Sequence, residues 1–144
     1  NEKMPDHVID LTLDAFKECN ESIEGSNILI LGISYKPNVK DIQLTPAKHV
    51  IKKLKSLGAN VYIYDPYFIS NRIFDINTEN NLNDIITKVN ASIILTGHNE
   101  FQKIDTSFFK KMKTPILIDT RAIVEPLSAK QNELIFRGLG RGYS

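Results

Sequence analysis

Four short runs of apolar residues recur along the 144-residue chain, each bounded by Gly, Pro, Asn or Asp. They occupy residues 27–33, 59–66, 91–97 and 115–120. A continuous apolar run of this length is typical of a strand that is buried on both faces, as in a parallel sheet. The run at residues 27–33 therefore predicts a buried strand, and the other three runs predict further strands.

Segments with helical periodicity separate these runs. In the clearest of them, which starts near Pro46, apolar residues recur at three- and four-residue spacing until Gly58. Thr45 precedes this helix as a possible cap. Residues 81–89 and 105–113 predict two shorter helices, and Asn81 or Asn83 is the expected cap of the former. This alternation predicts an α/β fold with a Rossmann-like parallel sheet, right-handed crossovers and helices on both faces.

A further helix is predicted at residues 4–25, ahead of the first strand. Pro5 suits its first turn, and its apolar residues form two adjacent stripes. Cys19 continues one stripe, so we expect it in the core. Because the apolar face is wider than one sheet contact requires, we expect it to pack against more than this domain. At the other end of the chain, four residues of the tail "RGLGRGYS", residues 137–144, are expected to be loose.

Composition and charge mainly exclude classes of protein and kinds of site. The length predicts one domain, and the net charge of +1 gives no general attraction to nucleic acid. One helix is rich in lysine, but a solvated face is the better interpretation of it. No membrane span or signal peptide is visible, and a single cysteine excludes an internal disulfide and a cysteine-based metal site. We therefore expect a cytoplasmic protein, and the first residue, Asn1, suggests part of a longer product.

Candidate chemistry gathers at the carboxyl ends of the predicted strands, where open α/β sheets bind ligands. The first strand is followed by a loop of twelve residues, 34–45, although such loops usually have about 2–6. Lys36 in this loop and Arg121 after the fourth strand are the cations best placed to hold a phosphate. We expect no catalytic residue and no metal ligand in this chain.

Each remaining polar candidate has a structural alternative. Asp41 and Gln43 of the long loop could face the cleft, and Asp41 could instead cap a turn in its own loop. His98 could face a cleft or be a satisfied polar residue beneath a loop, and Asp65 could bind a ribose or make a turn with Pro66. The segment "GISYKP" lacks the G-x-G-x-x-G pattern, so the first turn predicts a poor dinucleotide site.

Several linked motifs resemble one family. In order they are a glycine, an aromatic–lysine pair, an aspartate, a Thr-Pro helix start, L-x-x-x-G and a strand that ends in Y-D-P, followed later by "TGHNEF" and "IDTR". In this chain the first six are Gly32, Tyr35-Lys36, Asp41, Thr45-Pro46, Leu54 to Gly58 and Tyr64-Asp65-Pro66. The combination resembles the C-terminal domain of the UDP-glucose/GDP-mannose dehydrogenase family, and most closely its UDP-N-acetyl-D-mannosamine dehydrogenase branch.

The resemblance implies a domain organisation, a set of binding residues and an activity for the full-length protein. Residues 1–25 would be the end of a central dimerisation helix, and residues 26–144 would be the UDP-sugar-binding domain. Tyr35, Lys36 and Arg121 would contact the UDP-sugar. The full-length protein would be a homodimeric, NAD-dependent nucleotide-sugar 6-dehydrogenase. Its N-terminal domain would bind NAD, and a cysteine outside this chain would hold the sugar as a thioester during two-step oxidation.

The chain also departs from the family pattern. The family usually has an arginine that reaches the NAD side of the site at the position of Gln43, which cannot supply that charge. Cys19 lacks the glycines that flank the family's nucleophile, so we expect the chain alone to be inactive as a dehydrogenase. Two alternatives stay open: a non-catalytic nucleotide-binding or regulatory module, and a structural dimerisation piece.

Overall fold

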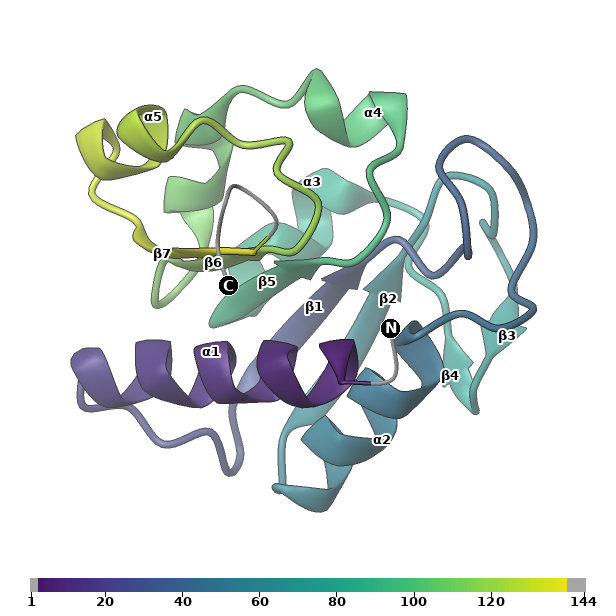
Figure 1. The fold of residues 1–144 in the computed structure, drawn as a ribbon, viewed down its shortest axis with the longest axis horizontal. Coiled ribbons are helices and arrows are strands. Elements are labelled where there is room, and N and C mark those ends of the chain that lie inside the picture. The colour runs from purple at the N-terminus through teal and green to yellow at the C-terminus, as the bar shows by residue number, and fades with distance from the viewer. Residues whose placement is uncertain (1–2, 140–144) are drawn as a thin grey trace.

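The computed structural model describes residues 3–139, and its centre is a five-stranded parallel sheet (Figure 1). The strand order is β2–β1–β5–β6–β7, and every neighbouring pair is parallel. The strands are β1 (Asn27–Leu31), β2 (Asn60–Tyr64), β5 (Ala91–Ile94), β6 (Ile116–Asp119) and β7 (Ile135–Gly138). The α/β fold class is confirmed, and each of the four predicted strands is present.

Helices cover both faces of the sheet (Figure 1). One face packs against α1 (Met4–Glu18) and α2 (Ala47–Ser56). The other face packs against five short segments, which are α3 (Leu82–Ile85), η1 (Ile86–Lys88), α4 (Asn99–Gln102), η2 (Thr106–Lys111) and α5 (Pro126–Gln131). A two-stranded hairpin, β3 (Arg72–Ile73) and β4 (Ile76–Asn77), lies outside the main sheet.

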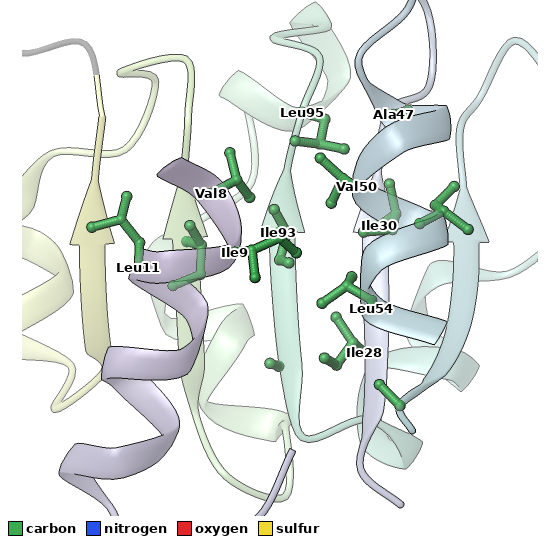
Figure 2. Close-up of a cluster of buried hydrophobic side chains, with 14 of the residues drawn as sticks. Val8, Ile9, Leu11, Ile28, Ile30, Ala47, Val50, Leu54, Ile93 and Leu95 are labelled. Atoms are coloured by element: carbon green, nitrogen blue, oxygen red, sulfur yellow. The ribbon is translucent and has the colours of Figure 1, made fainter. Parts of the chain in front are cut away.

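Alternation along each strand divides the core between these two faces. Ile28 and Ile30 of β1 point toward α1 and α2, whereas Leu29 and Leu31 point toward the short helices, and all four are fully buried. Figure 2 shows the first cluster, in which side chains of α1 and α2 meet the strands. Because a hydrophobic cluster covers each face of the sheet, a central strand needs apolar side chains on both faces. This explains the unbroken apolar run of β1.

The first helix is shorter than predicted, because α1 ends at Glu18 instead of continuing to residue 25. Asn20 adopts a left-handed conformation with φ of 56°, and the N–H of Glu21 reaches back to the carbonyl of Phe16. This arrangement closes the helix end and satisfies its last carbonyls. Cys19 therefore lies at the end of the helix, partly buried against the core, and not in its middle.

The broad apolar face of α1 finds its partners within this chain. Val8, Ala15 and Phe16 are buried in the cluster beneath α1, and of the large apolar side chains on the helix Leu13 is the exposed one, at 37%. The face is wide because α1 contacts α2 as well as strands β6 and β7. These contacts bury much of the face within this domain.

The structure also differs from the predictions for two helices and for the C-terminal tail. The predicted helix at 105–113 is a 3₁₀ helix, and the predicted helix at 81–89 is one α-helical turn followed by a 3₁₀ turn, with Asn81 as its cap. Strand β7, which includes Arg137 and Gly138 at the start of the tail, is a fifth strand of the main sheet that the sequence did not predict. Residues 140–144 of that tail lie outside the described residues. Between residues 3 and 139, no helix combines the length and hydropathy that a membrane span requires.

Candidate functional site

The strand order places a switch point between β1 and β5. From β1 the chain crosses to β2 on one side, and from β2 it crosses back to β5 on the other side. The loops after β1 and β5 therefore leave the sheet in diverging directions, which opens a crevice at the carboxyl edge. Gly32 lies at this point with φ of +90°, close against Thr96.

A cleft of about 880 Å³ opens at this edge of the domain. Its volume falls within the range of roughly 300–1,000 Å³ that is common for small-molecule sites. The lining residues come from the start of α1, the loop after β1, the first turn of α2 and the loop after β6; they are Met4, Pro5, Tyr35, Lys36, Leu44, Thr45, Pro46, His49 and Arg121. The cleft thus brings the adjacent residues Tyr35 and Lys36 together with Arg121, which is distant in sequence.

The cleft lining favours an anion. It contains the cations Lys36 and Arg121 together with His49, and no carboxylate belongs to this set of described residues. An Arg presents a planar fork of donors and a Lys a point charge, and both suit phosphate oxygens. The lining also includes apolar surface from Met4, Pro5 and Leu44, on which a flat ring could rest.

The turn after β6 fixes the position of Arg121. The buried Asp119 carboxylate accepts the backbone N–H of Arg121 at 2.9 Å with one oxygen and that of Val124 at 2.7 Å with the other. The Nε of Arg121 donates to the carbonyl of Leu95 at 2.8 Å. Partial burial lowers the pKa of Arg121 from its ordinary value, although an arginine retains its charge at neutral pH.

His98 lies beneath the loop and does not line the cleft. It is fully buried, and its ring contacts Tyr67 and Phe101 with centroids 4.8 and 5.5 Å away. Its Nδ1 accepts the backbone N–H of Asn38 at 2.8 Å, and its Nε2 lies 3.0 Å from Oδ2 of Asp65. Of the two alternatives for His98, this geometry matches the satisfied polar residue.

The neighbouring Ser34, His98 and Asp65 do not form a nucleophilic triad. Ser34 Oγ and the Asp65 carboxylate both approach the same ring nitrogen, Nε2, at 3.4 and 3.0 Å. In a hydrolytic triad the acid and the nucleophile contact opposite nitrogens of the histidine. All three side chains are also buried, at 1% exposure or less. The cluster is therefore structural.

The other predicted polar residues also serve the backbone. Asp41 accepts the N–H of Gln43 at 2.9 Å, and its carbonyl accepts the N–H of Tyr35 at 2.7 Å, which folds the loop on itself. Asp41 and Gln43 are exposed and do not line the cleft. Asp65 accepts the N–H of Tyr67 at 2.9 Å in a turn, and that of Ile33 at 2.8 Å.

Two residues that line the cleft, His49 and Leu44, were not among the candidates predicted from the sequence. His49 lies in the first turn of α2, so its place directly after the loop and the Pro46 helix start could have indicated it. Leu44 gives no such signal. It is 87% exposed and has a left-handed φ of 58°, a combination that an apolar pattern does not predict.

Comparison with known proteins identifies the relationship. Residues 29–126 match the model of the UDP-glucose/GDP-mannose dehydrogenase family, UDP binding domain. The chain belongs to this family. The match begins within β1 and reaches the start of α5, so it includes the long loop, β6 and the turn with Arg121.

Several named proteins are similar to most of this chain. The UDP-N-acetyl-D-mannosamine dehydrogenase of Pyrococcus horikoshii is 30% identical over 99% of this chain and 32% of its own length. The UDP-glucose 6-dehydrogenase of Rhizobium meliloti is 32% identical over 83% of this chain and 28% of its own length. A crystal structure of NDP-N-acetyl-D-galactosaminuronic acid dehydrogenase from Methanosarcina mazei Go1 has a TM-score of 0.88 at 25% identity, covering 98% of this chain and 30% of that one. The chain thus spans about a third of the length of these relatives.

Proposed function

We propose that this domain binds the nucleotide portion of a UDP-sugar in the cleft between the loop after β1 and the turn after β6. The observation that supports this most directly is the convergence of Tyr35, Lys36 and Arg121 on one cleft within a UDP-binding-domain sequence. In this proposal Lys36 and Arg121 hold the diphosphate. Tyr35, whose side chain is 46% exposed, offers a ring face to the base or the sugar.

The whole protein, we propose, is an NAD-dependent nucleotide-sugar 6-dehydrogenase. It would oxidise the C6 alcohol of a UDP-hexose or UDP-N-acetylhexosamine to a carboxylate through a cysteine thioester formed outside this chain. Binding the remote diphosphate would orient C6 at that distant cysteine. Residues 1–25 would belong to a dimer-forming central helix, and residues 26–144 to the substrate domain. The relatives, two of which are named as UDP-sugar dehydrogenases, support this proposal.

The described residues do not fit the pyrophosphate of NAD at the switch point. Such a site needs glycines that let the phosphates approach the backbone directly after the first strand. Here the space beside Gly32 is filled, because an added Cβ would lie 2.5 Å from Cβ of Thr96. The 15 residues 32–46 also separate β1 from the N-terminus of α2. NAD would accordingly bind mainly to the N-terminal domain of the full-length protein.

Calorimetric titration of the chain with UDP, and with GDP and NAD as controls, tests the proposal. We expect UDP to bind selectively, and Lys36→Ala and Arg121→Ala to weaken binding at least tenfold, because each removes a charged hydrogen-bond donor. Lys52→Ala is the matched control, since this exposed lysine of α2 does not line the cleft. Equal loss in all three variants, or no UDP binding, would contradict the proposal.

A second assay tests whether substrate binding belongs to this domain and catalysis and NAD binding to other parts of the full-length protein. We expect the 144-residue chain to show no UDP-sugar-dependent reduction of NAD, since the proposed nucleophile and NAD site lie elsewhere. Reduction of NAD by the purified chain would refute that assignment. Binding of NAD without binding of UDP would overturn the substrate-domain assignment itself.

A further inference from the structure

The loop at residues 34–45 is attached to the rest of the domain at its middle, through Asn38. The backbone N–H of Asn38 donates to Nδ1 of His98 at 2.8 Å. Its side-chain Oδ1 accepts the backbone N–H of Asn99 at 2.8 Å. Asn38 has a left-handed φ of 64°, which asparagine tolerates better than most residues. Both bonds arise two residues after Lys36.

The direction of these bonds determines the state of His98. A backbone N–H can only donate, so Nδ1 of His98 must be the acceptor for Asn38. The ring hydrogen of the neutral imidazole therefore lies on Nε2, which donates to Oδ2 of Asp65 at 3.0 Å. The same Asp65 oxygen accepts the N–H of Ile33 at 2.8 Å. One buried Asp–His pair thus binds the residue just before the loop and the middle of the loop.

The His98 ring cannot easily shift to follow the loop. It is fully buried and packed between Tyr67 and Phe101. By contrast, the segment that it holds is exposed, and all residues from Tyr35 to Asp41 belong to the exposed class. A rigid buried group therefore orders a segment that has few apolar contacts of its own.

We infer that Asp65, His98 and Asn38 are positioning residues for the nucleotide site. They form a latch, defined by these three residues, that orders the loop so that Tyr35 and Lys36 face the cleft before a ligand binds. The inference rests on the proposed UDP-binding function. None of the three lines the cleft, so the latch acts on the ligand through the two loop side chains. Ordering a loop in advance raises affinity because binding then costs less conformational entropy.

Substitutions at Asn38 test the latch without disturbing the core. Asn38→Gly removes the acceptor for Asn99 and tolerates the left-handed backbone, whereas Asn38→Asp retains both features. Val39→Gly is the matched control for added backbone flexibility, because its exposed side chain lies beside Asn38. We expect Asn38→Gly to weaken UDP binding about fivefold, the equivalent of one net hydrogen bond. Asn38→Asp and Val39→Gly should stay within about twofold of the wild type.

A second pair of variants addresses the buried ring. His98→Phe keeps the packing against Tyr67 and Phe101 but removes the ring hydrogen bonds to Asn38, Asp65 and Ser34, so UDP binding should weaken about tenfold or more. His98→Gln retains one donor and one acceptor and should restore part of the affinity. Thermal melting shows whether each variant folds. If His98→Phe does not fold, the Asn38 series alone decides.

Amide hydrogen exchange without ligand separates this inference from the proposed function. Faster exchange in the loop of Asn38→Gly than of Val39→Gly, together with weaker UDP binding, would support the latch. Faster exchange with unchanged UDP affinity would overturn the positioning role and leave the UDP site intact. Unchanged exchange would overturn the latch itself. A wild-type chain that does not bind UDP would overturn the proposed function, and the positioning role for UDP with it.

Discussion

Replacing Gly32 by alanine should strongly destabilise the domain, because this glycine lies where β1 and β5 part. Its φ of +90° is a conformation that residues with a Cβ rarely adopt. An added Cβ would lie 2.5 Å from Cβ and 2.9 Å from the backbone nitrogen of Thr96. The backbone nitrogen cannot turn aside as the end of a flexible side chain could, so the strand ends would have to move apart.

The expected loss of stability of Gly32→Ala has two parts, one from the backbone and one from packing. A left-handed conformation costs an alanine about 1–2 kcal/mol. Overpacking by one carbon in a filled interior costs about 1–3 kcal/mol. The free energy of unfolding of Gly32→Ala should therefore fall by about 2–5 kcal/mol, a large share of the roughly 5–15 kcal/mol typical of a domain.

A second glycine separates the two parts. Gly25 has a φ of +79°, and an added Cβ there would meet nothing within 4 Å. Gly25→Ala should thus show the backbone cost alone, about 1–2 kcal/mol. Urea denaturation of the wild type and both variants measures the difference, which we assign to the contact with Thr96. Equal destabilisation of the two variants would refute the packing argument.

Three other experiments test separate parts of the structure. Arg137→Met removes ion pairs to Asp14 and Glu18, and since both carboxylates are largely exposed, urea denaturation should show a loss of only about 0.5–1 kcal/mol. Burial raises the pKa of the Cys19 thiol. Because iodoacetamide reacts with the thiolate, the alkylation rate of Cys19 should begin to rise at a higher pH than that of free glutathione. Identical pH profiles for the two thiols would contradict this. Arg121→Lys keeps the charge but loses the planar fork and the bond to the carbonyl after β5, so calorimetry should show UDP binding about fivefold weaker, with thermal stability little changed.

The sheet could be predicted from the sequence wherever a strand is buried on both faces. The strands β1, β5 and β6 have apolar residues on both sides, which produce unbroken apolar runs. Strand β7 is different because it lies at the edge of the sheet and every one of its residues is only partly buried. An edge strand can end in Arg137 and Gly138, so its apolar run is short and does not predict a strand.

The site could be predicted only in part, because its side chains lie on irregular backbone. Position at the ends of strands indicated Lys36 and Arg121, and both line the cleft. The same reasoning could not exclude Gln43, whose N–H is bonded to Asp41 and which does not line the cleft. The direction of a side chain in a loop depends on local hydrogen bonds, and these leave no periodic trace in the sequence.

The long loop also determines what kind of anion site this domain can form. A glycine-rich turn holds phosphate with free backbone N–H groups. Here the N–H groups of Tyr35, Asn38 and Gln43 are already bonded within the loop or to His98. In the proposed site these three N–H groups are not available to an anion, so Lys36 and Arg121 would hold it, and its affinity should fall as the salt concentration rises. The proposed site would thus bind a diphosphate without the glycine pattern of a dinucleotide site.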